Sequence, residues 1–254
     1  MLLSIITINY NDKEGLARTM NSVLSQTYTD FEYIVIDGGS NDGSKTIIEQ
    51  HQDQLGYWVS EPDSGIYNAM NKGIAKANGE YVLFLNSGDY LITTTAIEDF
   101  IAAVDTLSYD IIYGDLQVVG ATPWVKTYPD ELGFNYLADE SLPHPSAFIK
   151  RACFEGNLYD ETLKIVADWK FFIIGICRLN YSYKHINIVL SVFNLDGISS
   201  TQKALITKER TLVLEQEFGV LLNDYKQFKL LQKKAYPPKS KLYLMLRRIY
   251  QKIK

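Results

Sequence analysis

The strongest constraint on the fold is an alternation of short apolar runs and amphipathic segments over the first ninety residues. The apolar runs are rich in β-branched or aromatic side chains and predict strands over residues 2–8, 31–36, 57–60 and 81–85. Helix-compatible segments follow three of them, over residues 16–24, 44–54 and 66–77. This alternation predicts an α/β chain with a mainly parallel sheet and helices on both faces.

Three of the predicted strands end in loops that hold carboxylate or amide side chains. These are Asn9, Asn11 and Asp12, then Asp37, Asn41 and Asp42, and finally Asn86 and Asp89. The carboxyl ends of parallel strands meet at one edge of a sheet, which is where ligands bind in open α/β folds. In any single loop such residues form turns and helix caps, but their convergence favours a shared ligand site.

The pattern becomes less regular from about residue 111. It predicts short strands over residues 111–113 and 116–119, a loop-rich stretch, an apolar helix over 167–179, and a strand pair over 182–186 and 188–194. Helical segments follow to the end of the chain and are broken at Pro237 and Pro238. The second half therefore does not repeat the first.

The composition excludes several classes of protein. The 254 residues are 46% hydrophobic and 22% charged, which is typical of a folded globular chain. Cys153 and Cys177 form no CxxC or His/Cys cluster, so no disulfide framework or zinc-thiolate site is indicated and a reducing compartment fits best. The longest apolar runs are too short to span a membrane, and the start of the chain is more typical of a buried strand than of a signal peptide.

Charge is divided unevenly along the chain, whose formal net charge is -5. Residues 226–254 hold ten Lys and Arg and no Asp or Glu, so residues 1–225 hold fifteen positive against thirty negative side chains. A basic end of this kind is typical of a segment that meets a polyanion, either an anionic membrane surface or nucleic acid.

Five segments of the chain, in this order, resemble motifs of the family 2 inverting glycosyltransferases. They are residues 5–11 (IITINYN), 22–28 (SVLSQTY), 35–44 (VIDGGSNDGS), 61–73 (EPDSGIYNAMNKG) and 79–89 (GEYVLFLNSGD). The resemblance is strong over about residues 3–90 and looser over 140–200. Five motifs in one order are far more specific than a single glycine-rich loop.

The resemblance implies a GT-A fold, which is a Rossmann-like mixed sheet with helices on both faces, followed here by a C-terminal helical extension. The implied glycosyltransferase domain covers residues 1–200, with a nucleotide-sugar half over about 1–110 and an acceptor half over 111–200. The extension, with its basic amphipathic tail, covers residues 201–254.

The activity that the resemblance implies is transfer of a hexosyl or N-acetylhexosaminyl group with inversion at the anomeric carbon. The donor is expected to be a nucleotide sugar, linked to uridine diphosphate, and the acceptor a hydroxyl of a saccharide or a lipid-linked saccharide in cell-surface polysaccharide biosynthesis. Such a displacement needs a base for the acceptor proton and a cation or dipole cluster for the leaving diphosphate.

Seven residues of the first half are assigned by resemblance to the nucleotide sugar: Thr7, Asn9, Asn11, Asp37, Ser40, Asp63 and Lys72. Thr7 and Asp37 would hold the nucleobase, with Asp37 accepting from an imide N–H such as that of uracil. Lys72 would neutralise phosphate. The ordinary alternatives are a turn or cap role for Asp37, a helix cap for Asn11 and a solvated helix lysine for Lys72.

The resemblance also places a divalent metal, Mn²⁺ or Mg²⁺, at the end of the fourth predicted strand. Many relatives carry an acidic cluster there, whereas this chain has Asn86-Ser87-Gly88-Asp89, in which Asp89 alone is acidic. One carboxylate together with the donor diphosphate suffices for such an ion, so Asp89 is the expected ligand. Asn86 would help through its amide oxygen or bind ribose. The alternative is a tight turn without a metal.

On the acceptor side the expected catalytic base is Asp168, because the segment VADWKFF over residues 166–172 is similar to the acidic acceptor-side motif of the family. The alternative is an acid favoured by the dipole at a helix N-terminus. His144 matches a loop histidine of close relatives and is expected to touch metal, diphosphate or acceptor. Its alternative is a structural histidine.

After the two prolines, residues 240–254 predict an amphipathic helix with an apolar stripe and basic side chains on its other faces. We expect it to lie on an anionic membrane surface, which makes the protein cytoplasmic and peripheral at the inner face of the cell membrane. The alternative is a terminal helix docked on the body of the protein. Nothing else in the chain is typical of a nucleic-acid binder, so no nucleic acid partner is expected.

Two rival functions share the nucleotide-binding architecture. The first is a partner subunit that keeps the nucleotide-sugar pocket but no longer catalyses, because its acidic cluster is reduced to one residue. The second is a sugar nucleotidyltransferase, which should carry a glycine-rich, basic phosphate loop directly after the first strand. Residues 9–12 (NYND) are nothing of that kind.

Overall fold

The computed structural model describes residues 2–104, 108–120, 122–195 and 202–235. The chain forms two compact units, Met1–Arg210 and Thr211–Lys254. The amphipathic helix that is predicted over residues 240–254 lies outside the described residues. Among the helices that the structure describes, none is both long enough and apolar enough to cross a membrane.

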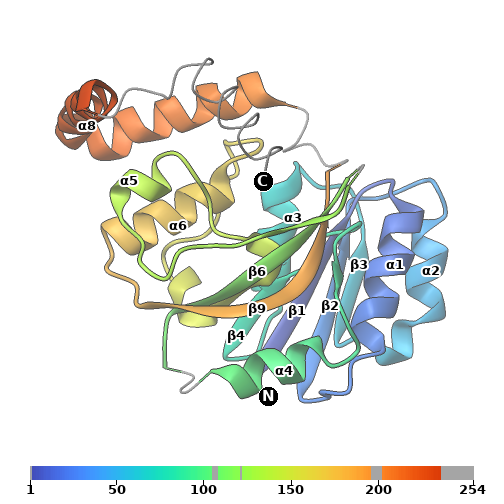
Figure 1. The fold of residues 1–254 in the computed structure, drawn as a ribbon. Helices are drawn as coiled ribbons and strands as arrows, with labels where there is room; N and C mark the ends of the chain where they lie inside the picture. Colours follow the sequence, from blue (N-terminus) through green and yellow to red (C-terminus); the bar gives the residue numbers. More distant parts are fainter. Residues whose placement is uncertain (1, 105–107, 121, 196–201, 236–254) are drawn as a thin grey trace, which may run out of the picture. The chain divides into compact units, whose positions relative to one another are not determined.

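A nine-stranded mixed sheet is the framework of the first unit (Figure 1). Its strands are β1 (Leu3–Asn9), β2 (Phe31–Asp37), β3 (Tyr57–Ser60), β4 (Tyr81–Phe84), β5 (Tyr90–Leu91), β6 (Ile111–Val119), β7 (Trp124–Lys126), β8 (Ala147–Lys150) and β9 (Tyr183–Asn194). Their order is β3-β2-β1-β4-β8-β6-β9-β5, and β7 pairs with β6 outside this path. β1 to β4 are parallel, β8 is antiparallel to both its neighbours, and β6 and β9 are parallel. The expected mixed sheet is confirmed.

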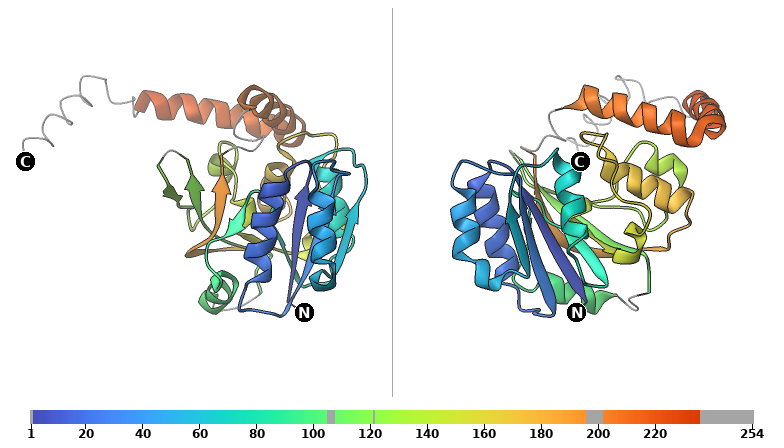
Figure 2. Two further views of the ribbon diagram at one scale, coloured as in Figure 1. Left: turned by 90° about the vertical axis from the view of Figure 1, so that its right-hand side faces the viewer. Right: turned by 180° about the vertical axis from the view of Figure 1, so that it is seen from behind.

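Helices cover both faces of this sheet, as the alternation in the sequence predicts. The helices are α1 (Lys13–Leu24), α2 (Ser44–Gln50), α3 (Ile66–Ile74), α4 (Ala96–Ala103), α5 (Phe134–Leu137), α6 (Ala167–Cys177) and α8 (Lys203–Ala235), with 3-10 segments η1 (Gln52–Gln54), η2 (His144–Ser146) and η3 (Arg151–Phe154). α1 and α2 lie on one face, and α3 and α6 lie on the other (Figure 1 and Figure 2). The backbone of α8 leaves helical geometry at Gly219.

The residues of β1 show why both faces need cover. Leu3 and Ile5 belong to the apolar core that includes Leu16 of α1. Ile6 points to the opposite face, where α3 approaches so closely that a Cβ on Gly73 would clash with it. β1 is buried along its whole length, as expected for a parallel strand between two layers of helices.

The strands of the second half differ from the prediction. The strand pair predicted over residues 182–194 was wrong, because one continuous strand, β9, covers this segment. The two short strands predicted over residues 111–119 are likewise one strand, β6. The parallel pairing of β6 and β9 shifts register around Asp115. Such an irregularity interrupts the apolar alternation, so the pattern predicts a break where the strand continues.

Candidate active site

Asp37 is the centre of a hydrogen-bond cluster at the carboxyl ends of β1, β2 and β3. The strand register places Asn9 level with Asp37, and Asp37 level with Ser60. Oδ1 of Asp37 accepts from Nδ2 of Asn9 (2.7 Å) and from Oγ of Ser40 (2.6 Å). Oδ2 accepts from N of Ser40 (3.0 Å) and from Oγ of Ser60 (2.6 Å). Four donors therefore fill the acceptor positions of this carboxylate.

These hydrogen bonds keep Asp37 ionised although it is fully buried. Burial by itself raises the pKa of a carboxyl group, but the bonds from Ser40, Ser60 and Asn9 outweigh burial and hold the pKa of Asp37 below its ordinary value. A nucleobase imide that donates to Asp37 must displace one of the four donors. The two serine hydroxyls give way most easily, because each turns about a single bond.

The structure brings Asn11 to the same cluster. N of Asn11 donates to Oγ of Ser40 (2.7 Å), and Oδ1 of Asn11 accepts from N of Asn41 (2.9 Å). Asn11 has a positive φ of 51°, which asparagine tolerates better than most residues. The helix-cap alternative for Asn11 was wrong, because Asp12 caps α1 and accepts from N of Gly15 (3.0 Å).

Thr7 and Lys72 lie differently from the rest of the assigned residues. Thr7 is fully buried, and its hydroxyl donates to O of Leu85 (2.7 Å) and lies 2.9 Å from Oη of Tyr33. The Thr7 side chain is thus part of the core below the cluster. Nζ of Lys72 donates to Oε1 of Glu61 (2.7 Å), so any phosphate that it meets must compete with this ion pair.

Asp63 lies over the loop that follows β2. A Cβ on Gly38 would stand 2.6 Å from Oδ2 of Asp63 and 3.2 Å from the ring of Tyr10, so these two side chains lie close against the backbone of Gly38. Oδ1 of Asp63 accepts from N of Gly65 (2.9 Å). Tyr10 was not singled out from the sequence, yet it is 68% exposed beside the cluster. An exposed aromatic ring in a polar loop offers a flat apolar surface to a ligand.

The loop that follows β4 is tied to the Asp37 cluster and to the second half of the unit. Oγ of Ser87 donates to Oδ1 of Asn9 (2.8 Å). Nδ2 of Asn194, at the end of β9, donates to O of Gly88 (2.6 Å). The loop is therefore held from both sides, by the last residues of β1 and β9.

The same loop suits a divalent metal only with help from the donor. In the part of the chain that the structure describes, no three His, Cys, Asp or Glu side chains gather to hold a metal. Oδ1 of Asn86 is buried without a hydrogen-bond partner among the described residues, which leaves an oxygen ligand three residues from the Asp89 carboxylate. These oxygens, completed by the phosphates of a nucleotide sugar, are the hard donor set that Mg²⁺ and Mn²⁺ prefer.

Asp89 makes folding stability depend on pH. It is 8% exposed, and burial raises its pKa to about 8, whereas the pKa of an Asp in an unfolded chain is about 3.9. Between these values the folded chain keeps a proton that the unfolded chain releases, so this group lowers the free energy of unfolding as the pH rises.

We expect Asp89→Asn to remove this part of the pH dependence, because the amide stays neutral. Urea denaturation of both proteins without metal, at pH 5.5 and pH 8, measures the effect. The variant should lose less stability between the two pH values than the wild type. Asp53→Asn, in the exposed segment η1, is the matched control and should leave the difference unchanged. Equal losses in wild type and Asp89→Asn would contradict the assignment.

Asp168 lies in the first turn of α6, where the helix dipole favours a carboxylate. Oη of Tyr67 in α3 donates to Oδ1 of Asp168 (2.9 Å), a contact between residues 101 positions apart. Burial, followed by the charge of Asp168, raises the pKa of Tyr67 well above its ordinary value, so Tyr67 stays protonated and remains the donor. The bond joins α3 to the first turn of α6 at the candidate base.

His144 is buried among the aromatic rings of Phe84, Tyr159 and Phe172. Its Nε2 lies 2.7 Å from Oη of Tyr159, and its ring stacks on Phe84 with centroids 4.8 Å apart. Burial lowers the pKa of His144, although the charge of Asp168 opposes the shift, so the ring is neutral at pH 7. These contacts favour the structural alternative for His144.

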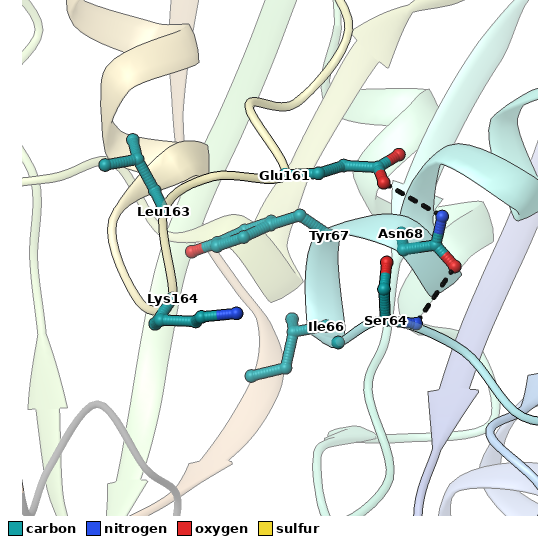
Figure 3. Close-up of a pocket in the computed structure, with 8 residues that line it drawn as sticks. Ser64, Ile66, Tyr67, Asn68, Glu161, Leu163 and Lys164 are labelled. Carbon is teal, nitrogen blue, oxygen red and sulfur yellow. Dashed lines mark hydrogen bonds between the residues drawn. The ribbon is translucent and has the colours of Figure 1, made fainter.

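A pocket of about 190 Å³, partly open to solvent, lies between the start of α3 and the segment before α6 (Figure 3). It is lined by Ser64, Gly65, Ile66, Tyr67, Asn68, Glu161, Leu163 and Lys164. Nδ2 of Asn68 donates to Oε2 of Glu161 (2.9 Å) across it, and Lys164 extends beneath the ring of Tyr67.

Comparisons with known proteins agree with this geometry. The model of the family "Glycosyl transferase family 2" matches residues 4–173. An uncharacterized glycosyltransferase of Mycobacterium tuberculosis is 32% identical over 203 residues, which are 78% of this chain and 77% of that protein. Among solved structures, residues 1–349 of Staphylococcus aureus TarS in complex with UDP-GlcNAc match with a TM-score of 0.65 and 21% identity, over 80% of this chain and 61% of that one.

A second solved structure, the mannosyltransferase PcManGT from Pyrobaculum calidifontis in complex with GDP-Man and Mn²⁺, matches with a TM-score of 0.60 and 14% identity. The match covers 78% of this chain and 58% of that one. This chain thus spans about three fifths of either structure. At these identities the likeness is one of fold, and it confirms the GT-A architecture.

Proposed function

The chain belongs to glycosyl transferase family 2 and has a GT-A fold, and from this premise we propose that it moves a sugar from a uridine-diphosphate-linked donor to a hydroxyl of a saccharide or lipid-linked acceptor, with inversion, in cell-surface polysaccharide biosynthesis. The observation that carries the proposal is the Tyr67–Asp168 pair. It ties the Asp168 carboxylate to Tyr67, which lines the pocket of Figure 3. Release of nucleoside diphosphate from a nucleotide sugar is the reaction that tests it.

In this proposal the nucleobase binds at the Asp37 cluster. Its imide N–H replaces the hydroxyl of Ser40 or Ser60 on the Asp37 carboxylate, and the freed serine bonds elsewhere. The exchange costs little free energy, because one hydrogen bond to the same carboxylate replaces another. The exposed ring of Tyr10 offers a stacking surface beside it. Support for a nucleotide sugar as ligand comes from the UDP-GlcNAc and GDP-Man complexes of the two structural neighbours.

The leaving diphosphate is proposed to lie at the loop that follows β4. Asp89 and the amide oxygen of Asn86 would hold a Mn²⁺ or Mg²⁺ ion together with the phosphates. Such an ion, when bound, neutralises the negative charge that develops on the leaving group. Ligation would need the ionised form of Asp89, so this carboxyl group would have to give up its proton at neutral pH to hold the ion.

Asp168 is proposed to take the proton of the acceptor hydroxyl. Tyr67 occupies Oδ1 of Asp168, which orients the carboxylate and assigns the proton to Oδ2. The acceptor sugar would enter by the pocket in Figure 3, where the Ser64 hydroxyl and Lys164 are available to its polar groups. As the proton leaves, the acceptor oxygen attacks the anomeric carbon from the side opposite the diphosphate, which inverts the configuration.

One observation favours a second candidate, a nucleotide-sugar-binding partner subunit. The loop that follows β4 holds one carboxylate, Asp89, and its pKa of about 8 leaves it largely protonated without a metal. A protein of this kind would bind the nucleotide sugar and release no nucleoside diphosphate. Both candidates therefore bind a nucleotide sugar, but only the enzyme releases nucleoside diphosphate from it.

We also propose that the second unit attaches the protein to an anionic membrane surface, through residues 240–254 of the sequence. Support comes from its described part, where Val220 is 79%, Leu231 64% and Phe228 52% exposed on a segment followed by a strongly basic one. Exposed apolar side chains and basic charge together favour the interface of an anionic bilayer.

Vesicle flotation tests this attachment. The full chain should float with vesicles that contain phosphatidylglycerol and much less with phosphatidylcholine alone, because each basic residue near an anionic surface contributes about 1 kcal/mol. A chain that ends at Ala235 should lose most of this flotation. Equal flotation of the two chains would remove residues 240–254 from the attachment.

A further inference from the structure

Helix α8 begins at Lys203, well beyond the family match, which ends at residue 173. Its second and third turns nevertheless place two charged residues, Glu209 and Arg210, against the segment that carries Asp168. We infer that Glu209 and Arg210 are positioning residues for the candidate base. The inference rests on the proposed function, because it gives these residues a role in the transfer step.

Glu209 holds the backbone that leads into α6. It is 6% exposed. Its Oε1 accepts from N of Lys164 (2.8 Å), and its Oε2 accepts from N of Ile165 (3.1 Å). Hydrogen bonds from two adjacent backbone N–H groups to one carboxylate fix both its position and its plane. The residue at the N-cap of α6, Val166, has no capping side chain, so Glu209 supplies acceptors just ahead of this helix.

The backbone segment that Glu209 binds runs from the wall of the pocket towards the candidate base. Lys164 lines the pocket of Figure 3, and Asp168 follows Ile165 by three residues. A shift of this backbone would move the pocket wall and the base together. Misplacement of a catalytic group by about 1 Å costs about 100-fold in rate, so the contact bears on catalysis as well as on folding.

Arg210 holds the other side of the same turn. Its guanidinium carbon lies 4.9 Å from the ring centre of Trp169, the residue after Asp168, and its Nη1 donates to O of Asp139 (2.6 Å). Trp169 is itself anchored, because its Nε1 donates to O of Leu137 (2.6 Å). Burial lowers the pKa of Arg210. Nearby carboxylates oppose this shift, and the charge of Asp168 has the largest opposing effect. Arginine stays charged under these conditions.

The choice of charged residues points to positioning rather than to stability alone. Burial of charged groups costs free energy, and apolar side chains of similar volume stabilise such a place as well or better. Nε of Arg210 is buried without a partner among the described residues, which adds to this cost. The two side chains nonetheless bracket Asp168 along the chain, one through residues 164 and 165 and the other through Trp169.

Glu209→Gln in the full chain tests the inference. The amide can accept at one oxygen only, so one of the two backbone bonds is lost. We expect the kcat for transfer, or for donor hydrolysis, to fall about tenfold or more, while the KM for the nucleotide sugar and its dissociation constant stay within about twofold. Amide hydrogen exchange at Lys164 and Ile165 should become faster. Glu215→Gln, at an exposed glutamate of the same helix, is the matched control and should change none of these.

Arg210→Lys and Arg210→Met provide a second test, which also stands if Glu209→Gln does not fold. Lysine keeps the charge beside Asp168 but loses the planar stacking, so it should recover part of the kcat that methionine loses. An unchanged kcat in Glu209→Gln with faster exchange at Lys164, or equal kcat values for the two Arg210 variants, would overturn the inference and leave the proposed function standing. A wild type that binds nucleotide sugars without turnover would overturn both.

Discussion

Replacement of Asp168 by Asn is expected to lower transfer by about 10²–10⁴-fold, the range that a positioned general base contributes. The substitution removes the base and can leave its surroundings in place. Tyr67 donates to Oδ1 of Asp168, and an asparagine could still accept this bond while losing the ability to take a proton. The variant should keep its fold, because Asp168 is only half-buried in the first turn of α6.

Nucleotide binding separates loss of the base from loss of the fold. The dissociation constant for uridine diphosphate, measured by calorimetry, should be unchanged in Asp168→Asn, because the Asp37 cluster is built from other strands. Asp160→Asn is the control, since Asp160 is a carboxylate of the same half that pairs with Lys170 and should leave turnover near the wild-type value. Wild-type turnover in Asp168→Asn would show that another group takes the proton.

Tyr67→Phe adds a graded comparison at the same site. It removes the hydrogen bond to Asp168 but leaves the carboxylate. The loss of turnover should therefore be smaller than in Asp168→Asn, and it should appear in kcat rather than in nucleotide affinity. A loss as large as that of Asp168→Asn would show that the phenol itself takes part in the chemistry.

The second large effect is expected from Asp37→Asn, which should weaken nucleotide binding by about 10- to 100-fold. A hydrogen bond to a charged group contributes about 1.5–3 kcal/mol, and the neutral amide cannot accept equally at both positions. Whichever way the amide is turned, its NH₂ group also faces another N–H donor, either Nδ2 of Asn9 or N of Ser40. Some folding stability should be lost as well, so affinity must be measured well below the melting temperature.

Two variants separate nucleotide recognition by Asp37 from its part in the fold. Ser60→Ala removes one internal donor and frees an acceptor position on Asp37, so nucleotide affinity should hold or rise. Asp42→Asn changes an exposed carboxylate of the same loop, one that binds Ser44 and the backbone of Lys13, and should leave affinity unchanged. Equal nucleotide affinity in Asp37→Asn and wild type would place the nucleobase elsewhere.

Local sequence patterns were sufficient to predict β1 to β4 and α1 to α3, whereas β5 and α4 were not predicted. Each of β1, β2 and β4 is an apolar run that ends in a polar loop, and the register of parallel strands then brings Asn9 and Asp37 together without further information. The GT-A architecture was predicted from the resemblance to the family and not from these patterns, and it is confirmed. Where β6 and β9 shift register, the local alternation failed, and one strand was predicted as two.

Contacts between distant segments could not be predicted. Nothing in the sequence near Tyr67 indicates Asp168, which lies 101 positions away. Thr7 was assigned to the nucleobase, yet its side chain on β1 is buried in the core and its hydroxyl contacts that of Tyr33. Glu209 lies in a segment with ordinary helical composition, so its bonds to the backbone of Lys164 and Ile165 became visible only with the fold.

The most direct test of the central claim is release of nucleoside diphosphate from a panel of UDP- and GDP-sugars, with and without lipid-linked acceptors, in Mn²⁺ and in a chelator. We predict that the wild type releases nucleoside diphosphate from at least one UDP-sugar in Mn²⁺ and that chelation strongly reduces this release. Asp168→Asn should release it about 10²–10⁴-fold more slowly while binding the same nucleotide. Binding of a UDP-sugar with no release under any condition would contradict the account and favour the partner-subunit candidate.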